Sequence, residues 1–234
     1  MMSMLYLLPG LLCDEVTWAH QVAGLADLAQ VRVPVFYGFH SLTAMAESVL
    51  ADAPGRFAVA GHSMGARVAL EIARLAPKRV ERIALLDTGT HPVQPGEPEK
   101  RQVLVDLAEA EGMGALADRW LPPMLHPDAA RSAALMPVLH AMVCRATPAI
   151  YRGQITALLN RPDADAVVRT LRCPTLVACG RQDAWSPLAQ HEAIVALAPH
   201  ARLVVFEDSG HMAPMEAADA VTGALREWMA DADR

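Results

Sequence analysis

The sequence predicts an α/β fold, a mainly parallel twisted sheet with helices on both faces and an inserted helical lid. Three observations predict it. Short apolar runs of strand length alternate with segments of helical periodicity along most of the chain. Most of these runs are continuous rather than alternating, as in strands covered on both faces. Between residues 91 and 162 the alternation stops, and prolines divide the chain into helix-sized pieces.

The predicted strands are short runs rich in Val, Leu and Ile. They cover residues 4–8, 31–35, 56–60, 80–86, 175–179 and 202–206. The predicted helices cover residues 15–28, 42–51, 64–75, 187–197 and 214–230. Strand and helix units that alternate in this way form a parallel sheet with right-handed crossovers.

We expect residues 1–90 and 163–234 to form one core domain and residues 91–162 to form the lid. Within the lid, Thr147-Pro148 is typical of a helix N-cap followed by proline in the first turn. Ligands bind beyond the carboxyl ends of the strands in open α/β sheets. A lid inserted at this end would cover the binding site.

Composition excludes several classes of protein. Hydrophobic residues make up 53% of the chain and charged residues 20%, which is enough for a large core and gives no case for disorder. The net charge is −6 and basic residues form no block, so nucleic acid is not an expected partner. The four cysteines lack metal-ligand spacing and are expected to be reduced core residues.

The apolar first residues are predicted to form a buried strand rather than a signal peptide. No Lys or Arg precedes them, and Pro9-Gly10 interrupts the run. No later stretch reaches the roughly 18 apolar residues that a membrane span requires. We therefore expect no membrane span and a cytoplasmic location.

The pentapeptide Gly61-His62-Ser63-Met64-Gly65 marks a candidate nucleophile. The pattern Gly-x-Ser-x-Gly arises by chance roughly 0.03 times in a chain of this length, so its context matters. Here it joins a predicted strand to a predicted helix, and a serine at such a sharp turn forms a nucleophile elbow. The close approach of strand and helix explains the small residues on either side. Ser63 is the predicted nucleophile.

A serine nucleophile needs a base, and the base needs a carboxylate. His211 follows the last predicted strand, so its loop lies at the carboxyl edge of the sheet, where it can reach Ser63. Asp183 follows the preceding strand through a glycine turn, and the order Ser63, Asp183, His211 is the one found with this elbow. Asp87, at the end of the strand at 80–86, is the alternative acid.

The oxyanion formed in acyl transfer needs preorganised N–H donors. The predicted donors are the backbone N–H groups of Met64, at the start of the elbow helix, and of Leu11, in the turn after the first strand. Leu12 is the alternative to Leu11. The candidate substrate-binding residues lie near this turn, near the elbow and histidine, and in the lid: Leu12, His62, Trp120, Met124, Met142 and Met212.

The chain resembles the α/β-hydrolase superfamily over essentially its whole length. The matching motifs are Leu8-Pro9-Gly10-Leu11, the elbow at 61–65, the acid turn at 180–183, and Ser209-Gly210-His211 followed by Glu216. Pro9 stands where the family usually has histidine. The chain also begins at what would be the family's third strand, which implies a shortened sheet.

The resemblance implies hydrolysis through an acyl-enzyme. Position 63 is serine rather than the aspartate of epoxide hydrolases and haloalkane dehalogenases, and Met212 stands where carbon–carbon bond hydrolases often have tryptophan. We expect cleavage of small-molecule carboxylic esters with small to medium apolar acyl groups, without a metal or organic cofactor. The alternatives are carbon–carbon bond hydrolysis, lactone opening, a lyase step on the same residues, or a ligand-binding protein without catalysis. The sequence predicts no oligomeric state.

Overall fold

The computed structural model describes residues 2–128 and 133–231. Its strands are β1 (Ser3–Leu8), β2 (Ala29–Arg32), β3 (Phe57–His62), β4 (Val80–Leu86), β5 (Thr175–Gly180) and β6 (Arg202–Phe206). Its α-helices are α1 (Ala19–Gly24), α2 (Leu42–Asp52), α3 (Met64–Leu75), α4 (Glu97–Trp120), α6 (Met136–Cys144), α7 (Pro148–Leu159), α8 (Asp165–Thr170), α9 (Leu188–Leu197), α10 (Ala213–Glu216) and α11 (Ala218–Ala230). The described residues also form the short 3₁₀ helices η1 (Glu15–Trp18), η2 (Pro77–Arg79) and η3 (Pro122–Met124).

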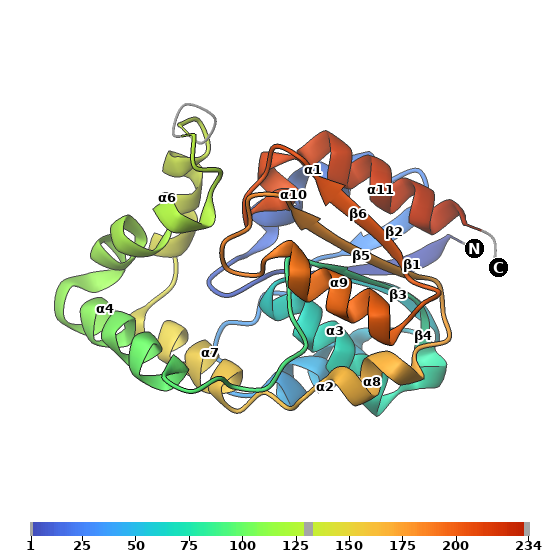
Figure 1. Ribbon diagram of the computed structural model, residues 1–234, viewed down its shortest axis with the longest axis horizontal. Helices are drawn as coiled ribbons and strands as arrows, with labels where there is room; N and C mark the ends of the chain where they lie inside the picture. Colours follow the sequence, from blue (N-terminus) through green and yellow to red (C-terminus); the bar gives the residue numbers. More distant parts are fainter. Residues whose placement is uncertain (1, 129–132, 232–234) are drawn as a thin grey trace.

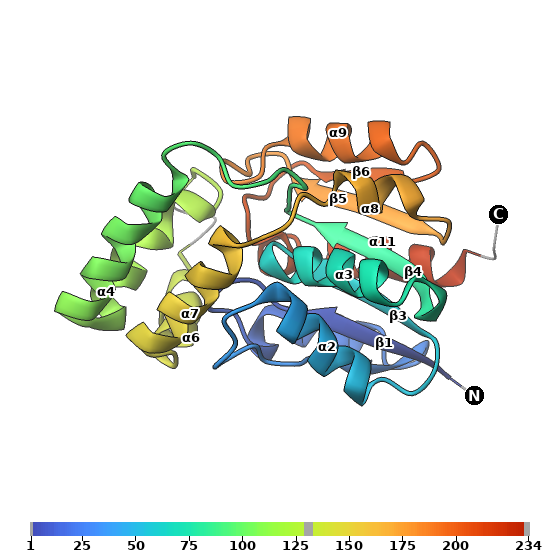
Figure 2. The same cartoon turned by 90° about the horizontal axis from the view of Figure 1, so that it is seen from below.

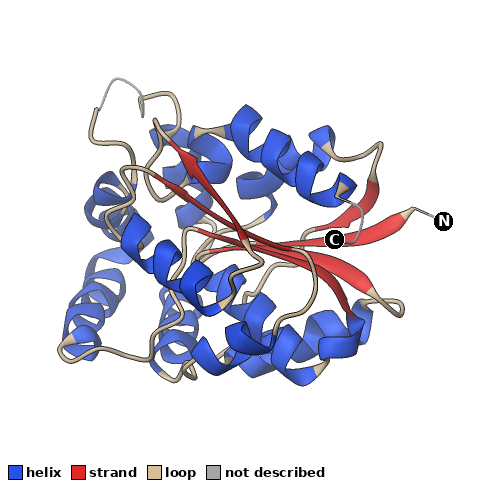
Figure 3. Ribbon diagram, turned by 45° about the vertical axis from the view of Figure 1, so that its right-hand side comes forward, coloured by secondary structure: helices blue, strands red, loops and turns tan. Residues whose placement is uncertain are grey.

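The six strands form one parallel sheet in the order β2-β1-β3-β4-β5-β6. The sheet is strongly twisted, and helices cover both of its faces (Figure 3). Figure 2 shows α2, α3 and α8 on one face, and Figure 1 shows α1 and α11 on the other. The predicted fold class is therefore confirmed.

Successive residues of a strand enter two different hydrophobic cores, because side chains alternate across a sheet. In β1, Leu5 and Leu7 pack in the core that contains Trp18 of η1. Tyr6 and Leu8 pack in the other core, with residues of α2 and α3. Both faces are buried, so the strand reads as a continuous apolar run in the sequence.

The segment between β4 and β5 contains α4, η3, α6, α7 and α8. Figure 1 shows α4, α6 and α7 beyond the carboxyl ends of the strands, while α8 lies beside the sheet. The Thr147 side chain caps α7 by accepting a hydrogen bond from the N–H of Ile150. This confirms the helix N-cap predicted from Thr147-Pro148. The N–H of Ala164 donates to the carbonyl of Thr90, which ties the two ends of the segment together.

Several predicted boundaries were wrong. The strand expected at 31–35 is β2, which ends at Arg32, because Pro34 has no N–H to pair with a neighbour. The helix expected at 15–28 is a 3₁₀ turn followed by the short α1, and the helix expected at 214–230 is broken at Ala217, whose φ and ψ are −120° and 44°.

Cys144 is exposed rather than in the core, because it ends α6 on the surface of the segment beyond the sheet. No helix in the described ranges combines the length and the apolar character needed to cross a membrane.

Candidate active site

Ser63 lies at the turn between β3 and α3, at the centre of the sheet's carboxyl edge. Its φ of 54° and ψ of −114° are strained for a residue with a side chain. Cβ atoms built on Gly61 and Gly65 would come within 2.3 Å of the Gly65 carbonyl oxygen and 2.1 Å of the Leu8 carbonyl oxygen, respectively. Only glycine fits at these two positions, and the resulting turn raises the serine side chain above the strand ends.

His211 is held in the loop between β6 and α10. Glu216 accepts hydrogen bonds from the N–H groups of Gly210 and Met212 through one carboxylate oxygen, and from the N–H of His126 through the other. The N–H of His211 donates to the carbonyl of Met124. These bonds fix the backbone of the loop on both sides of the imidazole.

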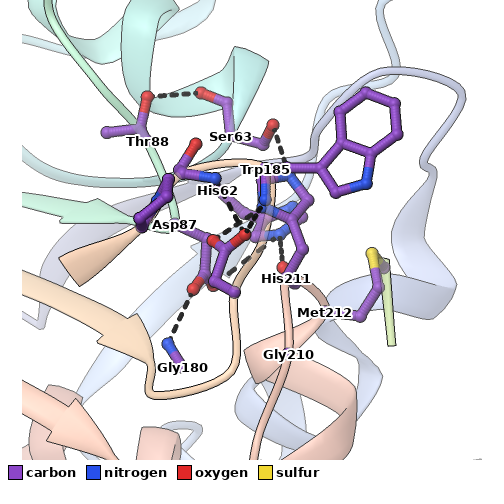
Figure 4. Close-up of polar contacts among 12 residues, drawn as sticks. His62, Ser63, Asp87, Thr88, Gly180, Trp185, Gly210, His211 and Met212 are labelled. Carbon is purple, nitrogen blue, oxygen red and sulfur yellow. Dashed lines mark hydrogen bonds and ion pairs between the residues drawn. The ribbon is translucent and has the colours of Figure 1, made fainter. Parts of the chain in front are cut away.

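The imidazole of His211 contacts both other members of the predicted set, and Figure 4 shows its contact with Ser63. Its Nε2 lies 2.9 Å from Ser63 Oγ, and its Nδ1 lies 2.8 Å from Asp183 Oδ2. A carboxylate only accepts hydrogen bonds, so Nδ1 carries the hydrogen in this contact. The lone pair of Nε2 is then directed to the Ser63 hydroxyl, as a general base requires.

Asp183 is almost completely buried, at 3% exposed. Its Oδ1 accepts hydrogen bonds from the N–H groups of Trp185 and Ser186, both at 2.8 Å. Burial opposes ionisation, but the charge and hydrogen bond of His211 and these two N–H donors outweigh it and hold the pKa of Asp183 below its ordinary value. The carboxylate therefore stays ionised beside the imidazole at neutral pH.

Asp87, the alternative acid, lies near this group without touching His211. Its Oδ1 accepts the N–H of Gly180 at 3.0 Å, and its Oδ2 lies 3.8 Å from His62 Nε2 (Figure 4). Complete burial, followed by the charge of Asp183, raises the pKa of Asp87 well above its ordinary value. The structure brings Asp183, and not Asp87, to the imidazole.

The His62 side chain holds the backbone of the loop that carries His211 through a hydrogen bond. Its Nε2 donates to the carbonyl oxygen of His211 at 2.7 Å. Burial, followed by the charge of His211, lowers the pKa of His62 to about 3, so the ring is neutral. A Cβ on Gly10 would come within 2.9 Å of this ring, which explains glycine in the turn after β1.

The two residues predicted to donate to the oxyanion line the same cavity as Ser63. They are Leu11, in the turn after β1, and Met64, the first residue of α3. The alternative donor, the N–H of Leu12, is directed elsewhere, since it donates to the Oε1 of Gln154 at 2.8 Å. Leu12 has a positive φ of 58°, and the Gln154 side chain that accepts its N–H comes from α7.

A cavity of about 300 Å³ opens above Ser63 and His211. Of the six predicted substrate-binding residues, His62, Trp120 and Met124 line it. Leu12 and Met142 are packed in the hydrophobic core, where the Met142 sulfur accepts a hydrogen bond from Thr17. Met212 is buried there too, and the walls of the cavity do not include it.

Several cavity residues were missed by the sequence analysis. Trp185 lies beside His211, with ring centroids 6.3 Å apart (Figure 4). Its ring also packs against that of Trp120, with centroids 6.2 Å apart. Its position two residues after Asp183 was the available signal. Arg67 and Arg161 also line the cavity, although the sequence offered nothing to distinguish them from the arginines of solvated helix faces. Within the part of the chain that the structure describes, no cluster of side chains is suited to a metal ion.

A parallel sheet with a strained serine at the turn after its central strand, and helices beyond its strand ends, is the architecture of an α/β hydrolase. The chain belongs to the alpha/beta hydrolase family, whose model matches residues 5–224.

Known proteins resemble the chain over most of its length. It is 30% identical over 229 residues to a pimeloyl-[acyl-carrier protein] methyl ester esterase of Aromatoleum aromaticum, covering 88% of this chain and 90% of that protein. The structure of a thermophilic esterase from Thermogutta terrifontis, with malate bound, aligns with a TM-score of 0.88 at 28% identity, covering 97% of this chain and 90% of that one. An enol-lactonase from Burkholderia xenovorans LB400 shares the fold, with a TM-score of 0.90 at 24% identity over 99% of this chain and 92% of that one.

Proposed function

We propose that the protein is a serine esterase in which Ser63, His211 and Asp183 form the catalytic triad. The observation that carries the proposal is the pair of contacts at 2.9 Å and 2.8 Å that joins these side chains at the wall of the cavity. Similarity to a family with several named esterases supports it.

The reaction follows from the direction of these bonds. Ser63 Oγ attacks the ester carbonyl carbon while His211 Nε2 takes the hydroxyl proton, and Asp183 stabilises the imidazolium that results. Nε2 then gives the proton to the departing alcohol, which leaves an acyl group on Ser63. A water molecule repeats the attack, its proton passes through Nε2 to Ser63, and the carboxylic acid departs.

The N–H groups of Leu11 and Met64 are the proposed oxyanion donors. They come from different segments, the turn after β1 and the first turn of α3, so the fold holds them in place before substrate arrives. Donors that need no reorganisation stabilise the charge that develops on the carbonyl oxygen.

The proposed substrate is a small-molecule ester with an acyl group of small to medium size. A cavity of about 300 Å³ is at the lower end of ordinary ligand pockets. Leu11, Trp120, Met124 and Leu158 give it apolar walls. We propose that residues 91–162 act as a lid, since they supply three of these four side chains.

The test compares the protein with Ser63→Ala on a panel of p-nitrophenyl esters, lactones, carbamates and ring-fission products. We expect ester turnover that falls by about 10⁴-fold or more in Ser63→Ala, and labelling of Ser63 by a fluorophosphonate. Melting temperatures of the two proteins serve as the control for folding. Ester turnover that survives in Ser63→Ala would exclude Ser63, and turnover of lactones alone would replace the proposed reaction.

A further inference from the structure

Four charged side chains gather in the cavity apart from the proposed triad. Arg67 comes from α3 in the core, Glu97 and Arg101 come from the start of α4, and Arg161 follows α7. All four line the same cavity as Ser63 and His211. We refer to Arg67, Glu97, Arg101 and Arg161 as the arginine cluster.

The arginine cluster has one carboxylate for three guanidinium groups. Glu97 accepts hydrogen bonds from Arg101 and Arg161 at 2.6 to 2.8 Å, and a backbone N–H from Gln94 at 3.1 Å. Burial opposes ionisation of Glu97, but these donors outweigh it and lower its pKa to about 2. The carboxylate is therefore ionised, and it leaves an excess of positive charge in the cavity wall.

Arg161 has no hydrogen-bonding capacity left for a ligand. Its Nε–H donates to the His91 carbonyl, and its terminal nitrogens donate to the carbonyls of Pro92 and Leu158 and to both oxygens of Glu97. These contacts account for all five N–H groups of a guanidinium. Arg161 joins the two ends of the segment beyond the sheet, which is a structural role.

Arg67 is different. It is only 8% exposed, yet its one hydrogen bond in the described chain goes from a terminal nitrogen to the His91 carbonyl, at 3.0 Å. Within the described residues, no carboxylate oxygen lies within 4.0 Å of it. Burial, followed by the charge of Arg161, lowers the pKa of Arg67 to about 9, so the group is still charged at neutral pH.

A buried charge without a counter-ion in contact with it is costly unless something in the site compensates it. Arg67 keeps four N–H donors without a partner in the described chain, on a side chain that lines the cavity. Arg101, about one-fifth exposed, faces the same cavity and, among the described residues, donates only to Glu97. The fold thus presents unused guanidinium donors where the substrate would lie.

We propose that Arg67, assisted by Arg101, binds a carboxylate of the substrate, so that the ester cleaved is a monoester of a dicarboxylic acid. The inference rests on the proposed esterase function of the same site. A planar guanidinium matches the two oxygens of a carboxylate, which it can bind through two parallel hydrogen bonds. Arg67 follows Ser63 by about one turn of α3, a rise of about 5.4 Å along the helix axis. The apolar walls of the cavity suit the methylene groups that separate the ester carbonyl from the free carboxylate of such a substrate.

Two substrates of nearly equal size test this preference. Mono-p-nitrophenyl adipate carries a free carboxylate, and methyl p-nitrophenyl adipate has the same chain without the charge. We expect the protein to prefer the anionic ester in kcat/KM, and Arg67→Gln to reduce this preference about 10- to 100-fold, the range for a lost hydrogen bond to a charged group. The change should appear mainly in KM. Arg67→Lys keeps the positive charge but lacks the planar pair of N–H donors, and it should retain part of the preference.

Arg152→Gln is the matched control, since Arg152 is an exposed arginine of α7 paired with Glu109, outside the cavity. It should keep the full preference for the anionic ester. If Arg67→Gln does not fold, the wild-type preference and the Arg67→Lys result still decide the question. A wild-type protein that hydrolyses both esters equally well would overturn the inference and leave the esterase proposal intact.

Binding separates the inference from the proposed reaction. Calorimetry with monomethyl adipate and dimethyl adipate on Ser63→Ala requires no turnover. We expect tighter binding of monomethyl adipate, and loss of that difference in Ser63→Ala/Arg67→Gln. If this binding difference is found but the wild-type protein hydrolyses no ester, the carboxylate site is supported and the proposed esterase reaction is rejected. A difference that persists in the double variant would place the carboxylate elsewhere and refute the role of Arg67.

Discussion

Replacing either buried acid near His211 with asparagine distinguishes their roles. In Asp183→Asn, the N–H groups of Trp185 and Ser186, both 2.8 Å from Oδ1, hold the amide oxygen in that position. The amide NH₂ then faces His211 Nδ1, which must accept, so Nε2 carries the hydrogen and cannot take the Ser63 proton. A reversed tautomer of this kind costs about 10⁴-fold in kcat, or about 5.5 kcal/mol.

Asp87→Asn leaves the wild-type tautomer of His211, with its hydrogen on Nδ1, undisturbed. The amide oxygen can still accept the Gly180 N–H, which lies 3.0 Å from Oδ1 in the wild-type protein. Burial and the charge of Asp183 raise the pKa of Asp87, so the substitution replaces a group whose neutral form the site already favours. We expect a loss in kcat below about tenfold, the effect of a displaced neighbour rather than of a lost triad member.

The assay is kcat for a p-nitrophenyl ester, measured for both variants from about pH 6 to pH 9. Melting temperatures show whether each variant is folded. The two losses should differ by about 10³-fold. Equal losses, or a larger loss in Asp87→Asn, would refute the assignment of Asp183 and the tautomer argument with it.

Two further predictions concern stability. Gly65→Ala places a Cβ 2.1 Å from the Leu8 carbonyl oxygen and should lower the free energy of unfolding by about 3 kcal/mol. Gly114→Ala in α4, with open space around the new Cβ, should raise the free energy of unfolding by about 0.5 to 1 kcal/mol. Urea denaturation measures both changes. Similar effects of the two alanines would contradict the close approach of β1 and α3 at the elbow. Asp87 has a folded pKa above its unfolded value, so its contribution to stability is fully present below the unfolded pKa and is lost as pH rises toward the folded pKa. The melting temperature of Asp87→Asn minus that of the wild type should therefore increase from about pH 4 to pH 8, and a flat difference would contradict the raised pKa.

Local patterns predicted much of the fold. The helix at 64–75 and the strand at 80–86 were predicted with the boundaries that the structure gives. Both are periodic apolar segments bounded by residues that end an element, such as Pro77 after the helix. The boundary errors arose where periodicity is weak: at the edge strand β2, at the helix expected at 15–28, and at the broken helix after Pro214.

The candidate site was predictable where it depends on chain order and local turns. Ser63, Asp183 and His211 each follow a strand of one parallel sheet, so their order along the chain placed them at one edge. The positions of Met142 and Met212 were not predictable, because apolar side chains that point into the core or into a cavity have the same local pattern. The use of the Leu12 N–H by Gln154 depends on a contact across 142 residues.

The sequence by itself determined the α/β alternation, the elbow around Ser63 and the order of its predicted partners, because strand period, helix period and glycine turns are properties of neighbouring residues. Only the tertiary structure decided that Asp183 rather than Asp87 contacts His211, and that Arg67 faces the cavity without a carboxylate partner in the described chain. These facts depend on distances between segments far apart in the chain. The burial and charge of a side chain follow from all the elements around it.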